Sequence, residues 1–489
     1  MSKFNTIIIG AGHNGLVCAS YLAKKGFKVL VLEKNEKLGG LVNLSTSLNG
    51  LSSKVLSDLN INLPKLNLNS FVVALNKEQN HTIIKEENNK INFYSSTANK
   101  EDQNKFSSLI NKYKLYSSTL SNFMHESPPR VKSGNMKDTL KLINMGWKIR
   151  KLGKKNMREL LRVLGLNIAD DLEDNLEDNA LKGLLSHEAI LGSNLGPRSP
   201  GSILTLLYKQ AIQNGLFNSA KYDFHQFIPT LEKKCLDLGV EIKNNASVDK
   251  ITISKNKVNG VILENGDKIE ADIVISNVDP KNTYFKLLGT QNLDTDFIRR
   301  AKNYRTKGNV AKLVLTLNEK PQINNIEKGK MNAKFIYAPS INYIENAFNA
   351  NKYNKYDNEM CFEFHHCENV IVANYYYVPY LINNTHDKET LTQKCINLIK
   401  PFVTNLEISK SELLTPNDIE NKYNINGGHW HHGDFEIDQM LMMRPFYGSS
   451  QYKTPIENLY LCSAGTHPAG GITAINGKNA AKKIIEDIK

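Results

Sequence analysis

The chain is poor in cysteine and tryptophan, and its few thiols are scattered. Its 489 residues include six cysteines and two tryptophans, and no two cysteines form a C-x-x-C pair. This argues against an oxidoreductase that works through a redox-active disulfide. Residues 361–367 (CFEFHHC) hold the densest set of potential metal ligands, but their alternation predicts a strand and their spacing fits no zinc pattern. We therefore predict no metal site, and the scattered thiols are typical of a reducing cytoplasm.

A long apolar run is also missing. No uninterrupted stretch approaches the roughly 18 residues of a membrane-spanning helix. A buried strand is expected to begin near Thr6, which leaves no room for a signal peptide or an amphipathic presequence. We therefore expect a cytoplasmic chain without a transmembrane helix.

Charge sets a further bound. The 62 Lys and Arg residues exceed the 49 Asp and Glu residues, which gives a formal net charge of +13. A basic surface is compatible with acidic lipid, nucleic acid or an anionic cofactor. No motif interleaves aromatic and basic residues, so we expect no nucleic-acid partner.

A glycine-rich turn near the N-terminus has the spacing of a dinucleotide site. The β-branched run at residues 6–9 predicts a buried strand, and it leads into the turn Gly10-Ala11-Gly12-His13-Asn14-Gly15. A helical pattern then runs to Gly26, where a glycine can end a helix. A second strand at residues 28–32 is followed by Glu33. Strand, turn, helix, strand and acid in this order predict a βαβ unit that binds a dinucleotide.

Each residue of this unit has a physical reason. Gly10 allows the tight turn, Gly12 lets backbone N–H groups approach a pyrophosphate, and Gly15 lets the helix pack on the sheet. The diphosphate is expected at the helix N-terminus, where unpaired N–H groups favour an anion. Glu33 is placed to accept hydrogen bonds from the ribose hydroxyls. The alternative is a structural βαβ unit with an empty crevice.

Two further glycine turns favour FAD over NAD. Gly39 and Gly40 follow the acid and give a flexible turn at the flavin end of the site. Residues 459–476 predict a second strand-to-helix turn, whose helix N-terminus can face the flavin pyrimidine ring or a phosphate. The candidate contacts from these turns are Lys34, Gly39, Gly40, Gly465, Gly471 and Ile472. Because the turns lie at opposite ends of the chain, the nucleotide domain is expected to be assembled from distant segments.

The pattern predicts an α/β fold with two discontinuous domains. Residues 1–70, 224–285 and 455–489 are expected to form a Rossmann-like FAD-binding domain. Residues 71–223 and 286–454 are expected to form a mixed α+β substrate domain with a helical insert.

Within that insert, residues 142–164 predict a strongly basic helix that also carries an apolar stripe. Its cations are Lys148, Arg150, Lys151, Lys154, Lys155, Arg158 and Arg162. This composition is typical of a helix that lies on an anionic membrane. The alternative is a solvated helix that packs its stripe on the core, since Gly146 and Gly153 interrupt a long ideal helix.

Residues 9–17, with His13 and Asn14 inside the glycine turn, resemble the FAD turn of the carotenoid and phytoene desaturase-like oxidoreductases. Within that family they resemble the branch called pyridine nucleotide-disulfide oxidoreductase domain-containing protein 2. Other matching segments are residues 146–150, 196–201, 276–280, 432–439, 443–445 and 459–471. The resemblance implies an FAD-dependent oxidoreductase with the two-domain architecture of the amine oxidase and phytoene desaturase group. It also implies that Val248 contacts the adenine through its backbone.

The sequence departs from that pattern at three places. Leu41 stands where many FAD enzymes have an arginine after the glycine pair. Residues 223–227 (DFHQF) replace a usual glycine-rich stretch, and residues 474–477 (AING) replace a Gly-Pro-Gly-like run. We expect the flavin contacts to differ in detail at these positions.

Candidate catalytic residues are few. Hydride would leave a C–H bond for the flavin, and the protein would supply orientation and electrostatics. His467 lies in the second glycine turn and could face the flavin ring, or it could be a packed turn residue. His432 and Asp434 could form an oriented acid–base pair, or they could lie in a solvated loop. Arg444 could pair with an anionic substrate or with Asp438.

Two functions are compatible with these residues. The first is an FAD-dependent oxidoreductase that takes hydride from an apolar, carotenoid-, retinoid- or lipid-like substrate, with peripheral contact to an anionic membrane through residues 142–164. The second is a flavoprotein that serves as a regulatory or partner-binding module with little turnover. Oxygen, a quinone and NAD(P) all stay open as electron acceptors.

Overall fold

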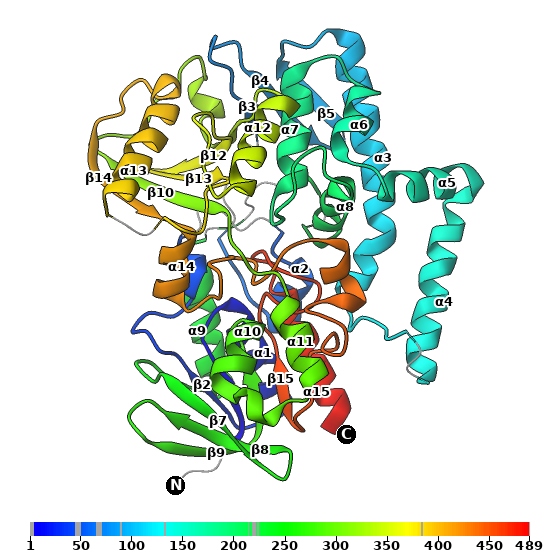
Figure 1. Ribbon diagram of the computed structural model, residues 1–489, viewed down its shortest axis with the longest axis vertical. Coiled ribbons are helices and arrows are strands. Elements are labelled where there is room, and N and C mark those ends of the chain that lie inside the picture. Colours follow the sequence, from blue (N-terminus) through cyan, green and yellow to red (C-terminus); the bar gives the residue numbers. More distant parts are fainter. Residues whose placement is uncertain are drawn as a thin grey trace.

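The computed structural model describes residues 4–44, 50–64, 71–88, 90–131, 134–213, 215–217, 222, 224–382 and 385–488. These residues form two lobes, each built on one mixed sheet (Figure 1). The predicted α/β class with a two-domain architecture is confirmed. The predicted domain boundaries stay a prediction, and those near residues 70 and 223 lie outside the described residues.

The first sheet joins strands from distant parts of the chain. Its seven strands are β1 (Phe4–Ile9), β2 (Val29–Leu32), β6 (Glu241–Lys243), β7 (Val248–Ser254), β8 (Lys257–Leu263), β9 (Lys268–Ser276) and β15 (Leu459–Leu461). The order is β6-β2-β1-β9-β8-β7, and β15 also pairs with β9. Strands β6, β2, β1, β9 and β15 run parallel, whereas β7 and β8 form an antiparallel hairpin on β9. Parallel strands are buried on both faces, which explains the apolar runs in β1 and β2.

The register brings several strand ends to one edge of this sheet. Ile9 lies opposite both Leu32 and Ser276, and Ser276 lies opposite Leu461. The helices α1 (His13–Ala23), α9 (Phe227–Asp237) and α15 (Ile475–Ile488) pack in one apolar core with this sheet. In open α/β sheets, ligands bind at the carboxyl ends of the strands. The chain therefore enters its candidate site wherever it leaves these strands.

The second sheet is mostly antiparallel. Its eight strands are β3 (Phe71–Ala74), β4 (Thr82–Glu87), β5 (Lys90–Ser95), β10 (Val310–Leu317), β11 (Ala333–Tyr337), β12 (Phe362–Cys367), β13 (Val370–Tyr376) and β14 (Ile408–Leu414). The order is β14-β10-β13-β12-β11-β3-β4-β5, with one parallel pair between β3 and β11. The strand predicted at residues 361–367 is confirmed as β12.

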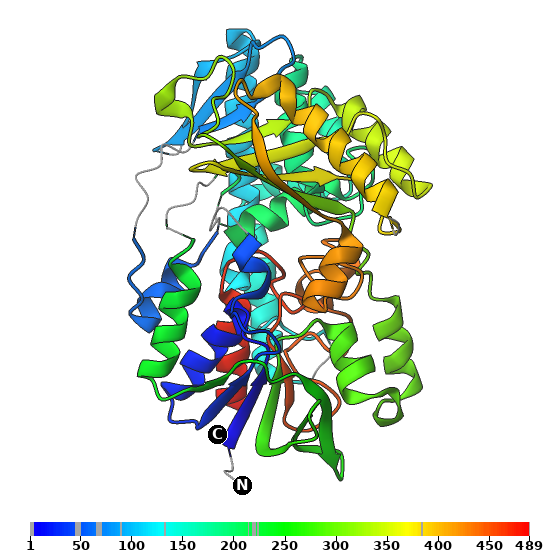
Figure 2. The ribbon, with the colours of Figure 1, turned by 90° about the vertical axis from the view of Figure 1, so that its left-hand side faces the viewer.

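Helices surround the second sheet and connect the lobes (Figure 2). Around the second sheet lie α3 (Lys100–Met124), α6 (Ile168–Glu173), α7 (Asn179–Ile190), α8 (Ser202–Gln213), α12 (Ile341–Lys352) and α13 (Thr385–Ile399). The remaining helices of the body are α2 (Ser53–Leu59), α10 (Pro280–Asn282), α11 (Thr295–Asn303) and α14 (Pro416–Tyr423). Buried residues of α3, α6, α7 and α8 share one hydrophobic core with the second sheet.

The basic segment forms two helices, α4 (Met136–Lys151) and α5 (Gly153–Leu164), which project from the body in Figure 1. They are separated at Gly153, which has a φ of +80°, while Gly146 lies inside α4. Helix α5 buries Leu160 and Val163, whereas Asp138 is the only buried residue of α4. The packing alternative therefore holds for α5 and is wrong for α4. Among the described residues, no helix combines the length and apolar character needed to span a bilayer.

Candidate cofactor and active site

A cavity opens between the two sheets, and most of the predicted cofactor residues line it. Its volume is about 510 Å³, within the range of about 300–1,000 Å³ that is usual for ligand pockets. The predicted residues that line it are Gly10, Gly12, His13, Asn14, Glu33, Lys34, Gly39, Gly40, Val248, Gly471, Ile472 and His432. Gly15, Gly465, His467 and Asp434 lie outside this lining.

The first glycine turn is closed by an asparagine that the motif did not reveal. Asn277 follows β9 at the carboxyl edge, and its amide donates a hydrogen bond to the carbonyl of Gly10 at 3.2 Å. A Cβ at Gly12 would lie 2.9 Å from that amide nitrogen, and a Cβ at Gly15 would lie 2.3 Å from the Gly10 oxygen. The turn therefore excludes side chains at Gly12 and Gly15. Its place directly after a buried strand at the ligand edge was a signal for Asn277.

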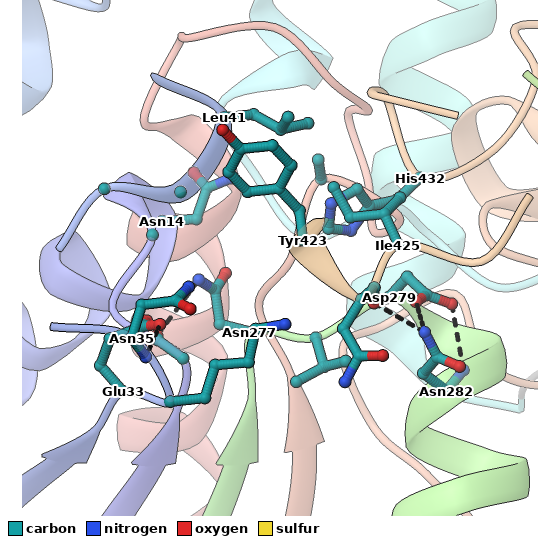
Figure 3. Close-up of a pocket in the computed structure, with 18 of the residues that line it drawn as sticks. Asn14, Glu33, Asn35, Leu41, Asn277, Asp279, Asn282, Tyr423, Ile425 and His432 are labelled. Carbon is teal, nitrogen blue, oxygen red and sulfur yellow. Dashed lines mark hydrogen bonds between the residues drawn. The ribbon is translucent and has the colours of Figure 1, made fainter. Parts of the chain in front are cut away.

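Glu33 is held in the orientation that ribose binding requires. Its carboxylate accepts the N–H of Ala11 at 2.8 Å and the N–H of Asn35 at 3.0 Å, and the residue is buried (Figure 3). A carboxylate has about four lone-pair sites, so two N–H donors leave acceptor capacity for hydroxyl groups. This geometry fits the adenosine ribose of a dinucleotide.

His13 offers a second point of fit. It lines the cavity, and its buried Nε2 has no hydrogen-bond partner among the described residues. Burial lowers the pKa of His13 to about 4, so the ring is neutral at neutral pH. Buried polar atoms in native proteins are nearly always hydrogen-bonded, and an unpaired one in a cavity fits a polar ligand group.

The second glycine turn contributes only in part. Gly471, with a φ of +103°, lines the cavity together with Ile472. A Cβ at Gly465 would instead lie 2.4 Å from the ring of Pro280, so this glycine permits close packing. His467 is buried behind the turn, and its Nε2 lies 2.9 Å from the carbonyl oxygen of Phe123. The prediction that His467 faces the ring therefore has no support in the geometry.

The predicted pair of His432 and Asp434 is wrong, because Asp434 has another histidine partner. Oδ1 of Asp434 lies 3.1 Å from Nε2 of His429, and Arg305 approaches the other carboxylate oxygen at 3.5 Å. His432 adopts a φ of +57° in a tight turn, and its carbonyl accepts the hydroxyl of Tyr304 at 2.6 Å. His432 lines the cavity, and burial followed by the charge of nearby Arg444 lowers its pKa to about 3.

Arg444 has a structural partner set that differs from the predicted one. Its guanidinium is fully buried and donates to the backbone carbonyls of His431, Gly433, Asp434, Gln439 and Ala464, at 2.9 to 3.3 Å. Asp438, the predicted partner, is bound by Arg305 at 2.6 and 2.9 Å. Arg444 therefore ties together the two segments that carry His431 and Ala464 into the cavity wall.

A buried network of charges lies on the second sheet, where the sequence pattern predicted no site. Lys209 approaches Glu188 at 2.5 Å, and Lys334 contacts Glu188 at 2.6 Å and Glu363 at 2.7 Å. Ligand atoms of His187, Glu188 and Glu363 lie within 4.8 Å of one another, as in a metal site. The two ammonium groups already neutralise these carboxylates, so the cluster is an ion-pair network.

Lys312 extends this network into the cavity. Its ammonium donates to Oδ1 of Asn374 at 2.9 Å, and the amide of Asn374 donates to Glu363 at 3.0 Å. Lys312, Glu363 and Asn374 all line the cavity, and the Lys312 nitrogen lies 5.1 Å from the ring centre of Trp430. Burial lowers the pKa of Lys312 to about 8. A lysine inside the otherwise apolar strand VAKLVLTL was the signal that could have found it.

The wall opposite the glycine turn is apolar. Leu41 and Leu44 of the short 3-10 helix η1 (Gly40–Leu44) pack against Ile419 and Tyr423 of α14 and against Ile425. Figure 3 shows Leu41 beside Tyr423, across the cavity from Glu33 and Asn277. The residue that replaces the expected arginine therefore contributes to an apolar surface.

Comparison with known proteins agrees with this geometry. Residues 15–485 match the family described as flavin containing amine oxidoreductase. The chain belongs to this family. Its membership confirms the predicted resemblance and the predicted cofactor, FAD.

Three relatives illustrate the range of the family. Pyridine nucleotide-disulfide oxidoreductase domain-containing protein 2 of Mus musculus is 23% identical over 551 residues, which span all of this chain and 94% of the relative. One of the limonene dehydrogenase polypeptides of Castellaniella defragrans is 22% identical, spanning all of this chain and 95% of the relative. A lycopene-forming phytoene desaturase of Pseudescherichia vulneris is 25% identical over 64% of this chain and 65% of its own.

A solved structure shows the same fold at lower identity. Cyclohexylamine oxidase from Brevibacterium oxydans superimposes with a TM-score of 0.57 and 14% identity, covering all of both chains. The likeness at this identity concerns the fold alone.

Two departures from the flavoprotein pattern now have a structural context. Residues 474–477 begin α15, and a Cβ at Gly477 would lie 2.1 Å from the carbonyl oxygen of Asn14. Gly477 therefore permits close packing of α15 on the start of α1. Asp223 lies outside the described residues, while Phe227 starts α9 and its ring centre lies 6.4 Å from that of His13. An aromatic residue here packs beside the glycine turn.

Proposed function

We propose that the chain is an FAD-dependent oxidoreductase that removes hydride from an apolar, lipid-like substrate. The observation that carries the proposal is the cavity that joins the dinucleotide edge of the first sheet to an apolar wall. Among the relatives, the limonene dehydrogenase and the phytoene desaturase are named for apolar hydrocarbons. Family membership supports the redox chemistry, and the wall supports the choice of substrate.

The residues divide into binding and positioning roles. Gly10, Gly12 and His13 would hold the phosphate region, and the fixed carboxylate of Glu33 would hold the ribose. Bound FAD supplies the hydride acceptor. Leu41 and Tyr423 would exclude water from the substrate side of the cavity. A neutral His432 can accept a proton there, since its pKa lies well below neutrality.

Anaerobic reduction of the purified flavoprotein tests this function. The flavin absorbance of the holoprotein would be followed after mixing with carotenoid, retinoid, fatty-acyl and amine compounds. We expect bleaching with a long apolar compound and none with a small polar amine. Bleaching by small amines alone would contradict the apolar substrate. Flavin that no compound reduces would favour the alternative, a regulatory or partner-binding flavoprotein.

We also propose that α4 rests on an anionic membrane and brings the cavity close to lipid. Met136, Leu140, Ile143 and Trp147 recur at spacings of four and three residues, and each is 58–73% exposed. Residues three and four apart share one face of a helix, so these side chains form an unpartnered apolar stripe. The basic residues of α4 and α5 flank it, which is the composition of helices that lie in the membrane interface.

Trp147 gives a direct test of this contact. In a Trp430→Phe variant, Trp147 is the sole tryptophan. We expect its emission to shift to the blue with phosphatidylglycerol vesicles at low salt, and much less with phosphatidylcholine vesicles. Ile143→Asp should abolish the shift, whereas Leu236→Asp, at a 55% exposed position on α9, should not. An unchanged Trp147 emission at low salt would refute the contact.

A further inference from the structure

The buried charges on the second sheet do not balance. Three lysines, Lys209, Lys312 and Lys334, face two carboxylates, Glu188 and Glu363. Both carboxylates are engaged by Lys209 and Lys334, at 2.5 to 2.7 Å. The network therefore carries one excess positive charge, and that charge belongs to Lys312.

Lys312 is only partly satisfied by the protein. It is 7% exposed, and its contact with Asn374 at 2.9 Å uses one of the three donors of an ammonium group. No carboxylate among the described residues lies within ion-pair distance of it. Buried charges are normally paired, because an isolated ion loses its hydration without compensation. Lys312 lines the cavity, so a partner could reach it from there.

The surroundings narrow the chemistry of that partner. Trp430 covers one side of the ammonium at 5.1 Å, and the apolar wall formed by Leu41, Ile419 and Tyr423 lines the same cavity. A ligand that satisfies both parts has one anionic end and an apolar body.

We propose that Lys312 binds the carboxylate of an amphipathic substrate whose apolar body lies along the Leu41–Tyr423 wall. This rests on the proposed function, since it names the substrate class of the same cavity. It adds the requirement that the apolar substrate is an acid. Pairing with a carboxylate neutralises the excess charge of the network and supplies the missing hydrogen-bond acceptors.

The test compares decanoate with 1-decanol, which has the same chain without the charge. Binding to the FAD-loaded protein would be followed by Trp430 fluorescence in a Trp147→Phe background, where Trp430 is the sole tryptophan, and by the flavin difference spectrum. We expect decanoate to bind more tightly than 1-decanol. Lys312→Met should weaken decanoate by about 30-fold or more, as for loss of one partner of a buried charge pair, and leave 1-decanol unchanged.

Matched variants separate this effect from general charge loss. Lys307→Met removes an exposed lysine that also contacts an asparagine, Asn354, at 2.9 Å, and it should leave decanoate binding unchanged. Lys312→Arg should retain the preference for the acid. If Lys312→Met does not fold, Lys312→Gln removes the charge while keeping a polar side chain, and it should lose the same preference.

Several results would overturn the inference. Equal binding of decanoate by wild type and Lys312→Met would do so, as would equal binding of decanoate and 1-decanol by the wild type, or no decanoate binding at all. Loss of FAD from Lys312→Met would mean that Lys312 serves the cofactor. Selective decanoate binding without flavin reduction by any acid would leave the subsite standing and count against the proposed oxidation. Reduction by neutral hydrocarbons alone would do the opposite.

Discussion

Replacing Arg444 with methionine should destabilise the cavity wall from behind, without altering the cavity lining. The Arg444 guanidinium donates five hydrogen bonds to backbone carbonyls from two separate segments, and it is fully buried. A net contribution of about 1 kcal/mol for each bond gives roughly 5 kcal/mol. Removing a buried cation recovers part of this, because the ion no longer has to be desolvated. We therefore expect Arg444→Met to lower the free energy of unfolding by about 3–5 kcal/mol.

The effect should be visible as a change in melting temperature. Unfolding entropy of about 2.1 cal/mol/K per residue gives roughly 1 kcal/mol per degree for 489 residues. The variant should therefore melt about 3–5 °C below the wild type. Circular dichroism would follow unfolding, and flavin fluorescence would follow FAD release. Release should move to lower temperature together with unfolding, because Arg444 holds the segments of His431 and Ala464.

Arg305 provides a control on the same segment. It pairs with Glu436 and Asp438, but its side chain is 41% exposed. Exposed ion pairs contribute about 0–1 kcal/mol, so Arg305→Met should melt within about a degree of the wild type. The reasoning fails if Arg444→Met melts with the wild type, or if Arg305→Met costs as much as Arg444→Met.

Three further predictions concern the cofactor site and the buried charges. Gly15→Ala should abolish FAD binding or folding, measured as flavin retained on purification, because the new Cβ would lie 2.3 Å from a carbonyl oxygen of the same turn; full flavin content would contradict the packing. Glu33→Gln should weaken FAD binding by about 10-fold or more in a fluorescence titration, since a charged acceptor is lost, while Glu36→Gln at an exposed position should have no effect. Burial would raise the pKa of Glu188, but the charge of Lys209 outweighs it and lowers the pKa to about 2. Since the folded pKa lies below the ordinary value of 4.5, this carboxylate stabilises the fold above about pH 4.5 by roughly 3 kcal/mol, and that stabilisation is lost as the pH falls towards 2. Urea unfolding of wild type and Glu188→Gln between pH 5 and 2 should show the gap between them closing; a constant gap would refute the assignment.

The first glycine turn shows what local sequence can determine. Strand, turn, helix and acid follow one another within about 30 residues, and each role depends on backbone geometry that the residues themselves set. The structure accordingly brings Gly10, Gly12 and Glu33 to one cavity. The second turn was less certain, because a strand-to-helix turn can face a ligand or a packed neighbour, and Gly465 faces Pro280.

Partnerships between distant side chains were beyond the reach of the sequence. His432 and Asp434 are close in the chain, yet the positive φ of His432 separates them, and His429 takes the carboxylate. Nothing near Arg444 shows that its partners are backbone carbonyls, because carbonyls leave no trace in residue identity.

The family, the cofactor and the place of the dinucleotide follow from the residues in order along the chain, because they rest on short-range backbone geometry. Which charges remain unpaired, and which apolar faces remain uncovered, becomes visible only in the folded molecule. Lys312 and the stripe on α4 gain their meaning when the second sheet and the projecting helices are placed in space. Burial and pairing depend on the whole fold, and so does the substrate that the cavity can accept.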